Sequence, residues 1–162
     1  MRGLTRIWKY LSALKINSKM FAEIIYIDID VAIAKHDEII TKTGGLSGIL
    51  ERGRLEGILE HIQNDDYYPT FVGKLTHLVD QINKQIFVDG SKRSSIAIGA
   101  YFLEINGFDQ AVVGYFMRAM ENPILLAARN ELNIDDLGAI IYDVIYDLEI
   151  SDKTKLRYLR LL

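Results

Sequence analysis

The apolar residues of this chain recur mainly at steps of three and four positions, which is the spacing of one face of an α-helix. Two stripes show the pattern most clearly: Val72, Leu75, Val79, Ile82 and Ile86 in the first, and Ile134, Leu137, Ile141, Val144, Ile145 and Leu148 in the second. Each stripe predicts one amphipathic helix with a buried face. The first helix is expected to end at Ile86, and Asp135 and Asp136 suit the N-terminal turn of the second.

Short polar or glycine-rich stretches separate the predicted helices. They are TGGLSG at 43–48, NDDYYP at 64–69, DGS at 89–91, NG at 106–107 and ENP at 121–123. The two prolines lie outside the long periodic stripes, so neither opposes a helix. The pattern therefore predicts an all-α domain, folded as a compact helical bundle.

The chain has 162 residues, 49% of them hydrophobic and 25% charged, which suits one globular domain with a sizeable core. It contains no cysteine, so disulfides, cysteine-ligated zinc and a cysteine nucleophile are excluded. No apolar run approaches the roughly 20 residues of a membrane span, because Glu104 and Asp109 interrupt the most hydrophobic stretch. These features predict a soluble, cytoplasmic protein without a membrane partner.

The net charge of −3 is distributed unevenly along the chain. Residues 1–22 and 153–160 contain only basic charges, whereas residues 23–152 hold all 22 Asp and Glu against 10 Lys and Arg, a net charge of −12. We interpret residues 1–25 as a basic, helical N-terminal extension and the tail KTKLRYLRLL as a basic amphipathic helix suited to accept a partner segment. Either these charges complement the acidic body, which we favour, or one end docks an acidic partner, a membrane surface or nucleic acid.

The stretch KQIFVDGSKRSSIA, residues 84–97, joins two predicted helices and carries candidate chemistry. Gly90 permits a tight turn, after which the unpaired amides of the next helix form an anion site. Lys92 and Arg93 add positive charge beside it, and Asp89 is placed to hold a magnesium ion that bridges phosphate oxygens. Taken alone, the residue pattern favours a simpler interpretation, an Asp-Gly turn with a serine cap and two exposed basic side chains.

A resemblance over a longer stretch of the chain favours the anion site over the simple turn. The segment IFVDGSKRSSIAIGAYFLEINGF, residues 86–108, resembles the signature region of the Fic/Doc family in its death-on-curing branch. The family pattern there is roughly His-Pro-Phe-x-Asp-Gly-Asn-Lys-Arg-Thr-Ala, followed by an apolar helix and Leu-Asn-Gly. The upstream segments YIDIDVAIAKHDEIITKTGGLSGILERGRLEGIL and YYPT resemble the same branch in order and spacing. The resemblance predicts a Fic/Doc-like helical domain over residues 26–162, with its motif at 85–93.

The resemblance implies a domain that binds Mg²⁺ with ATP at this loop. Members transfer AMP, or in part of this branch phosphate, to a Ser, Thr or Tyr hydroxyl of a target protein, as toxins restrained by a separate antitoxin. By position, Asp89 matches the metal-linked acid of the motif, and the nucleotide would be held by Gly90, Ser91, Lys92 and Arg93. The lysine at position 92 is the feature that favours the death-on-curing branch.

One departure from the family pattern concerns the catalytic base. Gln85 stands where the family has the histidine that takes the proton from the attacking hydroxyl. A neutral amide can only orient that hydroxyl, so most of the base's typical 10²- to 10⁴-fold contribution should be lost. Ser91 in place of asparagine retains a hydroxyl that can cap the helix. The chain has three histidines, His36, His61 and His77. None of them has a position suited to replace the base, and their spacing is not that of metal ligands.

Three hypotheses follow from the sequence. The chain is a Fic/Doc transferase impaired by Gln85, or a catalytically inactive nucleotide- or protein-binding module on the same scaffold, or an active toxin in which Gln85 is an engineered change. The second departure, at Ser91, weighs against the last of these. Tyr67 and Tyr68 precede the motif helix, and we interpret them either as packing at a turn or as residues that dock the target protein.

Overall fold

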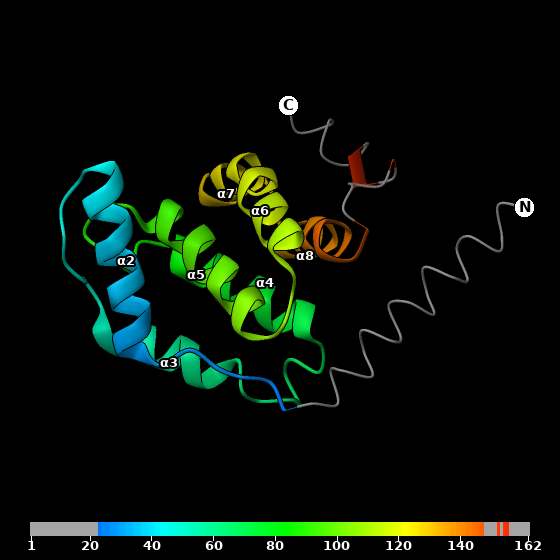
Figure 1. Cartoon of the computed structure of the whole chain (residues 1–162), viewed down its shortest axis with the longest axis horizontal. Coiled ribbons are helices and arrows are strands. Elements are labelled where there is room, and N and C mark those ends of the chain that lie inside the picture. Colours follow the sequence, from blue (N-terminus) through cyan, green and yellow to red (C-terminus); the bar gives the residue numbers. More distant parts are fainter. Residues whose placement is uncertain (1–22, 148–151, 153, 156–162) are drawn as a thin grey trace, which may run out of the picture.

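The protein is described by a computed structural model that covers residues 23–147 together with residues 152, 154 and 155 (Figure 1). Its helices are α2 (Ile29–Thr43), α3 (Arg52–His61), α4 (Phe71–Asn83), α5 (Ser91–Ile105), α6 (Gln110–Ala119), α7 (Glu121–Ala128), α8 (Ile134–Tyr142) and the π-helical turn η1 (Asp143–Asp147). The β-structure within these residues is one isolated antiparallel bridge between Ile49 and Phe87. The all-α prediction is confirmed. The predicted N-terminal extension, up to residue 22, and most of the basic C-terminal tail lie outside the described residues.

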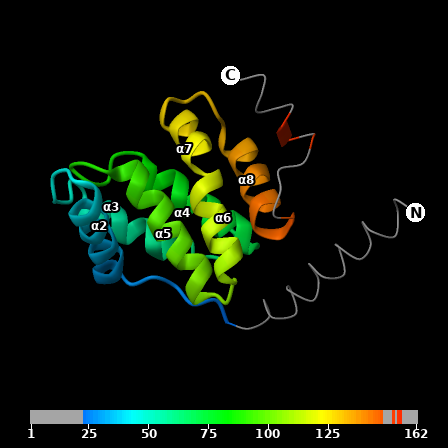
Figure 2. The same cartoon turned by 45° about the horizontal axis from the view of Figure 1, so that its top comes forward.

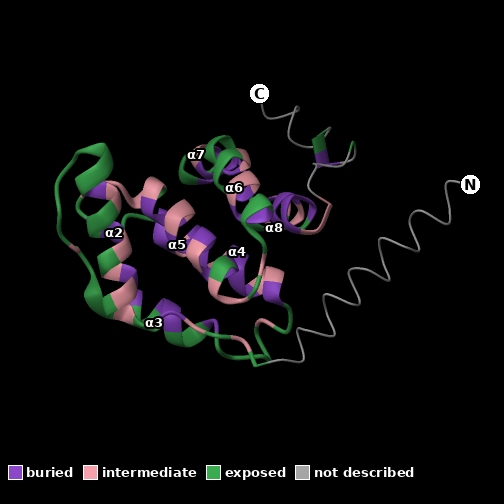
Figure 3. Cartoon of the chain, viewed as in Figure 1, coloured by how far each residue is buried: buried purple, intermediate pink, exposed green. Residues whose placement is uncertain are grey.

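Helix α5 lies at the centre of the bundle and packs against α2, α4, α6 and α7 (Figures 1 and 2). Gly99 allows its close approach to α4, because a Cβ atom there would lie 2.8 Å from Val79 Cγ2. Further along α5, the buried ring of Phe102 stacks on Phe71, with 4.9 Å between the ring centroids. The buried faces of α4 and α5 meet along this contact (Figure 3). The core therefore fixes the position of α5, whose N-terminus carries the motif.

The starts of most helices follow from capping side chains. In α2, α4, α6 and α8 the residue before the helix accepts a hydrogen bond from a first-turn amide; these caps are Asp28, Thr70, Asp109 and Asn133. Helix α5 differs, because its N-cap is Gly90 in the left-handed conformation and supplies no side-chain hydrogen bond. The amides at the start of α5 are therefore left open to another partner.

One of the predicted helix ends differs from the structure. Helix α4 ends at Asn83, three residues before the predicted end at Ile86, because Gln85 adopts a positive φ of 55° that a helix cannot accommodate. Ile86 is still fully buried, so its hydrophobic position is correct although its conformation is not helical. The second stripe forms α8 and continues as η1 to residue 147. Within the described residues, no helix is long and apolar enough to cross a membrane.

Candidate functional site

The motif residues form the turn that connects α4 to α5. After α4 the chain reverses at Gln85, whose φ of 55° is uncommon for a residue with a side chain. Phe87 then anchors the turn in the core with 2% of its surface exposed, and Gly90, with φ 71°, leads into α5. Gln85 thus lies at a locally strained position, and such positions are frequent at functional sites.

The loop between α2 and α3 holds this turn in place. Val88 N–H donates to the Gly48 carbonyl at 3.0 Å, and Leu50 N–H donates to the Ile86 carbonyl at 2.9 Å. From α3, Arg54 Nη1 donates to the Lys84 carbonyl at 3.1 Å, next to the strained residue. We name residues 44–50 the clamp loop, because its backbone pairs with the motif turn in this short ladder.

The first turn of α5 presents backbone donors without partners. Within the described part of the chain, no hydrogen bond occupies the amides of Ser91, Lys92 and Arg93. The Ser91 side chain closes the turn instead, because its Oγ accepts from Phe87 N–H at 3.1 Å. Three free amides and the positive end of the helix dipole make this terminus suited to an anion. Serine therefore preserves the turn at the position where the family pattern has asparagine.

Asp89 carries its negative charge beside these donors. Its Oδ2 accepts from Leu46 N–H at 3.2 Å and its Oδ1 accepts from Gly90 N–H at 2.6 Å. These backbone hydrogen bonds, first that from Leu46 and then that from Gly90, hold the pKa of the Asp89 carboxyl below its ordinary value. Gly45 is required for this contact, because a Cβ atom there would lie 2.5 Å from Asp89 Oδ2. The carboxylate thus stays ionised at neutral pH, as a magnesium ligand must.

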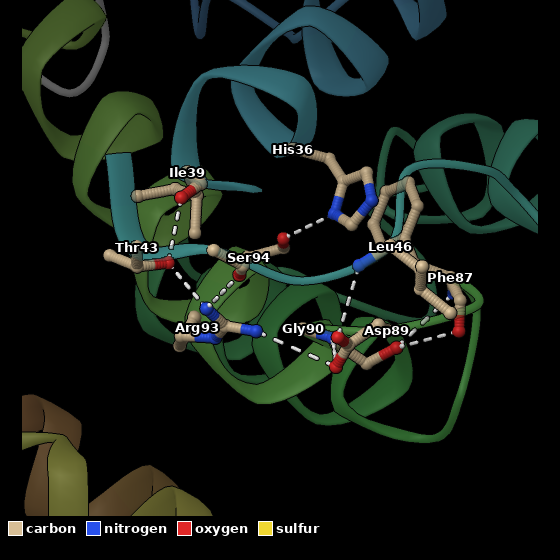
Figure 4. A network of polar contacts seen from close by, with 11 residues as sticks. His36, Ile39, Thr43, Leu46, Phe87, Asp89, Gly90, Arg93 and Ser94 are labelled. Carbon is tan, nitrogen blue, oxygen red and sulfur yellow. Dashed lines mark hydrogen bonds and ion pairs between the residues drawn. The ribbon is translucent and has the colours of Figure 1, made fainter. Parts of the chain in front are cut away.

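Arg93 is held by the end of α2 and the start of the clamp loop (Figure 4). Its Nη1 donates to Thr43 Oγ1 and to the Gly44 carbonyl, the latter at 2.8 Å. Its Nη2 lies 3.5 Å from Asp89 Oδ1. Asp89 and Arg93, two of the three charged residues that the resemblance assigns to the site, therefore lie together, and both contact the same loop.

His36 of α2 packs against the motif turn. Its buried ring stacks on Phe87 with 3.8 Å between centroids and an angle of 4°, and its Nδ1 lies 2.7 Å from Ser94 Oγ (Figure 4). Burial lowers the pKa of the His36 imidazole, with Arg93 contributing in the same direction. A neutral, stacked ring with 1% of its surface exposed indicates a structural role for this histidine.

The motif turn forms one wall of a crevice of about 890 Å³. Its lining from α4, the turn and α5 consists of Asn83, Lys84, Gln85, Phe87, Val88, Asp89, Gly90, Ser91, Lys92 and Arg93. Leu50 of the clamp loop and residues Ala127, Ala128, Arg129 and Asn130 at the end of α7 complete it. The structure thus brings together at one crevice every motif residue to which the sequence assigned a role in catalysis or in binding the nucleotide. Sequence reasoning missed the α7 wall, which lies more than thirty positions beyond the motif and has no local signal.

Tyr67 and Tyr68 lie elsewhere. They precede α4, whereas the motif follows its C-terminal end, and a helix of 13 residues is about 20 Å long. Tyr67 is 67% exposed, while Tyr68 Oη lies 3.0 Å from His77 Nδ1. Neither tyrosine lines the crevice, so their role in target docking stays a prediction.

The structure also brings two histidines together that the sequence left apart. The rings of His61 and His77 are 5.5 Å apart between centroids, beside Tyr68. Among the described residues, no group of three or more His, Cys, Asp or Glu is placed to hold a metal ion. Burial, and next the nearby His61, lower the pKa of His77.

The lowered pKa values of His36 and His77 predict a loss of stability in acid. Because each folded-state pKa is below the ordinary value of 6.5, the stabilisation is present above pH 6.5 and is lost as the pH falls through the folded-state value. Urea unfolding at about pH 7.5 and about pH 5 measures this difference. The variants His36→Gln and His77→Gln are each expected to show a smaller loss between the two pH values. An unchanged loss in both would contradict the assignment.

Comparison with known proteins adds one relative. No protein-family model matches the chain. The chain is similar to "Protein kinase doc" of Escherichia phage P1, with 34% identity over 79 residues. The match covers 46% of this chain and 63% of the phage protein, so the chain spans less than two thirds of that relative's length. Together with the all-helical fold, this similarity supports the resemblance to the Fic/Doc family that the motif segments show.

Proposed function

We propose that the crevice binds magnesium-ATP and that the chain is a Fic/Doc-type transferase with an impaired catalytic base. In this proposal a phosphoryl or AMP group passes from ATP to a hydroxyl side chain of a target protein. The observation that carries it is the start of α5, where three free amides, Lys92 and Arg93 face one crevice together with Asp89. Backbone amides at the N-terminus of a helix, together with nearby cationic side chains, neutralise the negative charge of phosphate oxygens.

The residues present fit magnesium that arrives with the nucleotide. Asp89 supplies one ionised carboxylate at the crevice, and its depressed pKa keeps it a good oxygen ligand. Magnesium in nucleotide sites is commonly held by one or two carboxylates together with phosphate oxygens and water. A single acid is therefore sufficient for a magnesium ion that is chiefly bound by the nucleotide.

The proposed reaction is a displacement at phosphorus. The target hydroxyl oxygen forms a bond to the γ- or the α-phosphorus, and the bond to ADP or to pyrophosphate, respectively, breaks. The proton of the hydroxyl must leave, and the resemblance assigns its removal to position 85. Because Gln85 is a neutral amide, it orients the hydroxyl without taking the proton, and the proton passes to water. The phage relative is named a protein kinase, which favours phosphoryl transfer over AMP transfer.

An experiment with labelled ATP tests this function. The protein and its Gln85→His variant are incubated with a cell extract and ATP carrying label at either the α- or the γ-phosphate. We expect labelled protein with the histidine variant, and the labelled position identifies the group transferred. Label from neither protein would contradict the transferase proposal. Efficient labelling by the unmodified protein would contradict the role assigned to Gln85.

A second candidate is a module that binds nucleotide or protein without turnover. Gln85 favours it, because the open amides and cations at the start of α5 suit an anion, whereas position 85 holds no basic side chain. An antitoxin-like segment of a separate protein is the expected protein partner under either proposal. Binding of magnesium-ATP without label transfer by the histidine variant would select this second candidate.

A further inference from the structure

We propose that Arg129, at the end of α7, is a second phosphate-binding residue, so that the crevice holds a nucleoside di- or triphosphate between two walls. The first wall is the start of α5 and the second is the end of α7. The proposal rests on the proposed function and extends it, because Arg129 lies outside the motif and is separated from Arg93 by 36 positions. It assigns the preference for a chain of phosphates to a specific residue.

The charges that line the crevice favour a polyanion. Four cationic side chains line it, against the single carboxylate of Asp89; the four are Lys84, Lys92, Arg93 and Arg129. Two of them are already engaged: Lys84 Nζ lies 2.8 Å from Asp80 Oδ2, and Arg93 is held by the end of α2. Within the described residues, the side chains of Lys92 and Arg129 have no hydrogen-bond or ion-pair partner. One free cation therefore stands on each wall.

The backbone at Arg129 is fixed by the way α7 ends. Glu131 N–H donates to the Leu126 carbonyl at 2.9 Å and Asn130 N–H donates to the Ala127 carbonyl at 3.1 Å. With Asn130 at a φ of 56°, this pair of bonds is a Schellman cap. Only the side chain of Arg129 is free to adjust to a ligand, and a guanidinium can grip a phosphate with two donors.

Asn83, the last residue of α4, fixes the position of α7 relative to the turn that carries the motif. Its Nδ2 donates to the Ile124 carbonyl of α7 at 3.0 Å, which joins the end of α4 to α7. That bond fixes the amide orientation, because the opposite orientation would place two oxygens together. Asn83 also lines the crevice, is 4% exposed, and its Oδ1 has no donor within the described structure. That oxygen is itself closed off from solvent, so it lies behind the wall of the crevice and is not offered to a ligand.

Affinity measurements by calorimetry with magnesium-ATP and with AMP test the role of Arg129. A single phosphate can be held by the α5 wall alone, whereas a triphosphate reaches the second wall. We therefore expect Arg129→Ala to weaken magnesium-ATP binding roughly tenfold and AMP binding less than about twofold. Arg129→Lys is expected to retain part of the affinity, because it keeps the charge but not the two-donor fork.

Two matched variants separate this inference from the proposed function. Arg93→Ala is expected to weaken both nucleotides, whereas Arg118→Ala removes an exposed arginine of the neighbouring groove and should change neither. If the unmodified protein binds no magnesium-ATP, the proposed function fails and this inference fails with it. If it binds ATP and Arg129→Ala leaves the ATP affinity unchanged, or weakens ATP and AMP equally, only the inference is overturned. An unchanged thermal midpoint shows that Arg129→Ala has not altered the fold.

Discussion

Replacing Gln85 with histidine is expected to raise the rate of label transfer from ATP by roughly 10²- to 10⁴-fold, the usual contribution of a general base. The backbone accepts this change, because histidine is among the residue types enriched at positive φ, and φ is 55° at this position. The new imidazole would project from the turn that lines the crevice, a few positions before the anion-binding amides of α5. Neither the clamp loop nor the core must rearrange.

The pH dependence and two controls identify the histidine as a base. Only the neutral imidazole takes a proton, so the rate should rise with pH through the imidazole pKa and then level off. Gln85→Ala should give no increase over the unmodified protein, since it adds no basic group. Combining Gln85→His with Arg93→Ala should remove most of the gain, because the nucleotide is then poorly held. An equal gain with alanine and histidine would show that relief of strain, not proton transfer, limits the unmodified protein.

Truncating Phe102 to alanine should lower the free energy of unfolding by about 3–5 kcal/mol, the usual cost of removing a buried aromatic ring. The side chain of Phe102 is fully buried in the last turn of α5, where it stacks on Phe71 and on Tyr26. The neighbouring helices cannot fully close the cavity that the missing ring leaves, because α5 is packed against four of them. Urea unfolding measured by circular dichroism gives the difference directly.

Phe102→Leu is the matched control for the truncation. It keeps most of the apolar volume and is expected to cost less than about 1.5 kcal/mol. In conditions where the alanine variant remains folded, its affinity for magnesium-ATP should be close to that of the unmodified protein, because Phe102 lies three turns from the start of α5. A cost below about 1 kcal/mol for the alanine variant would contradict the packing of α5 against α4.

The helices and the motif were predictable because their signals are local. A stripe at steps of three and four identifies α4 through side chains a few residues apart, and Gly90 marks the turn before α5 in the same way. The end of α4 was predicted three residues too late because Ile86 is apolar and buried, as a helical residue on that stripe would be. The spacing of apolar residues shows which positions are buried, but it does not distinguish a buried position in a helix from a buried position in a turn.

The sequence by itself determined the helical class, the faces that pack, and the order of charges along the motif, since each depends on neighbours within one or two turns. Tertiary structure alone decided that His36 lies under Phe87, that the clamp loop contacts Asp89, and that the end of α7 faces the start of α5. These contacts join residues more than thirty positions apart. They arise from how side-chain ridges set the crossing of packed helices, a property of the assembled bundle that no single segment encodes.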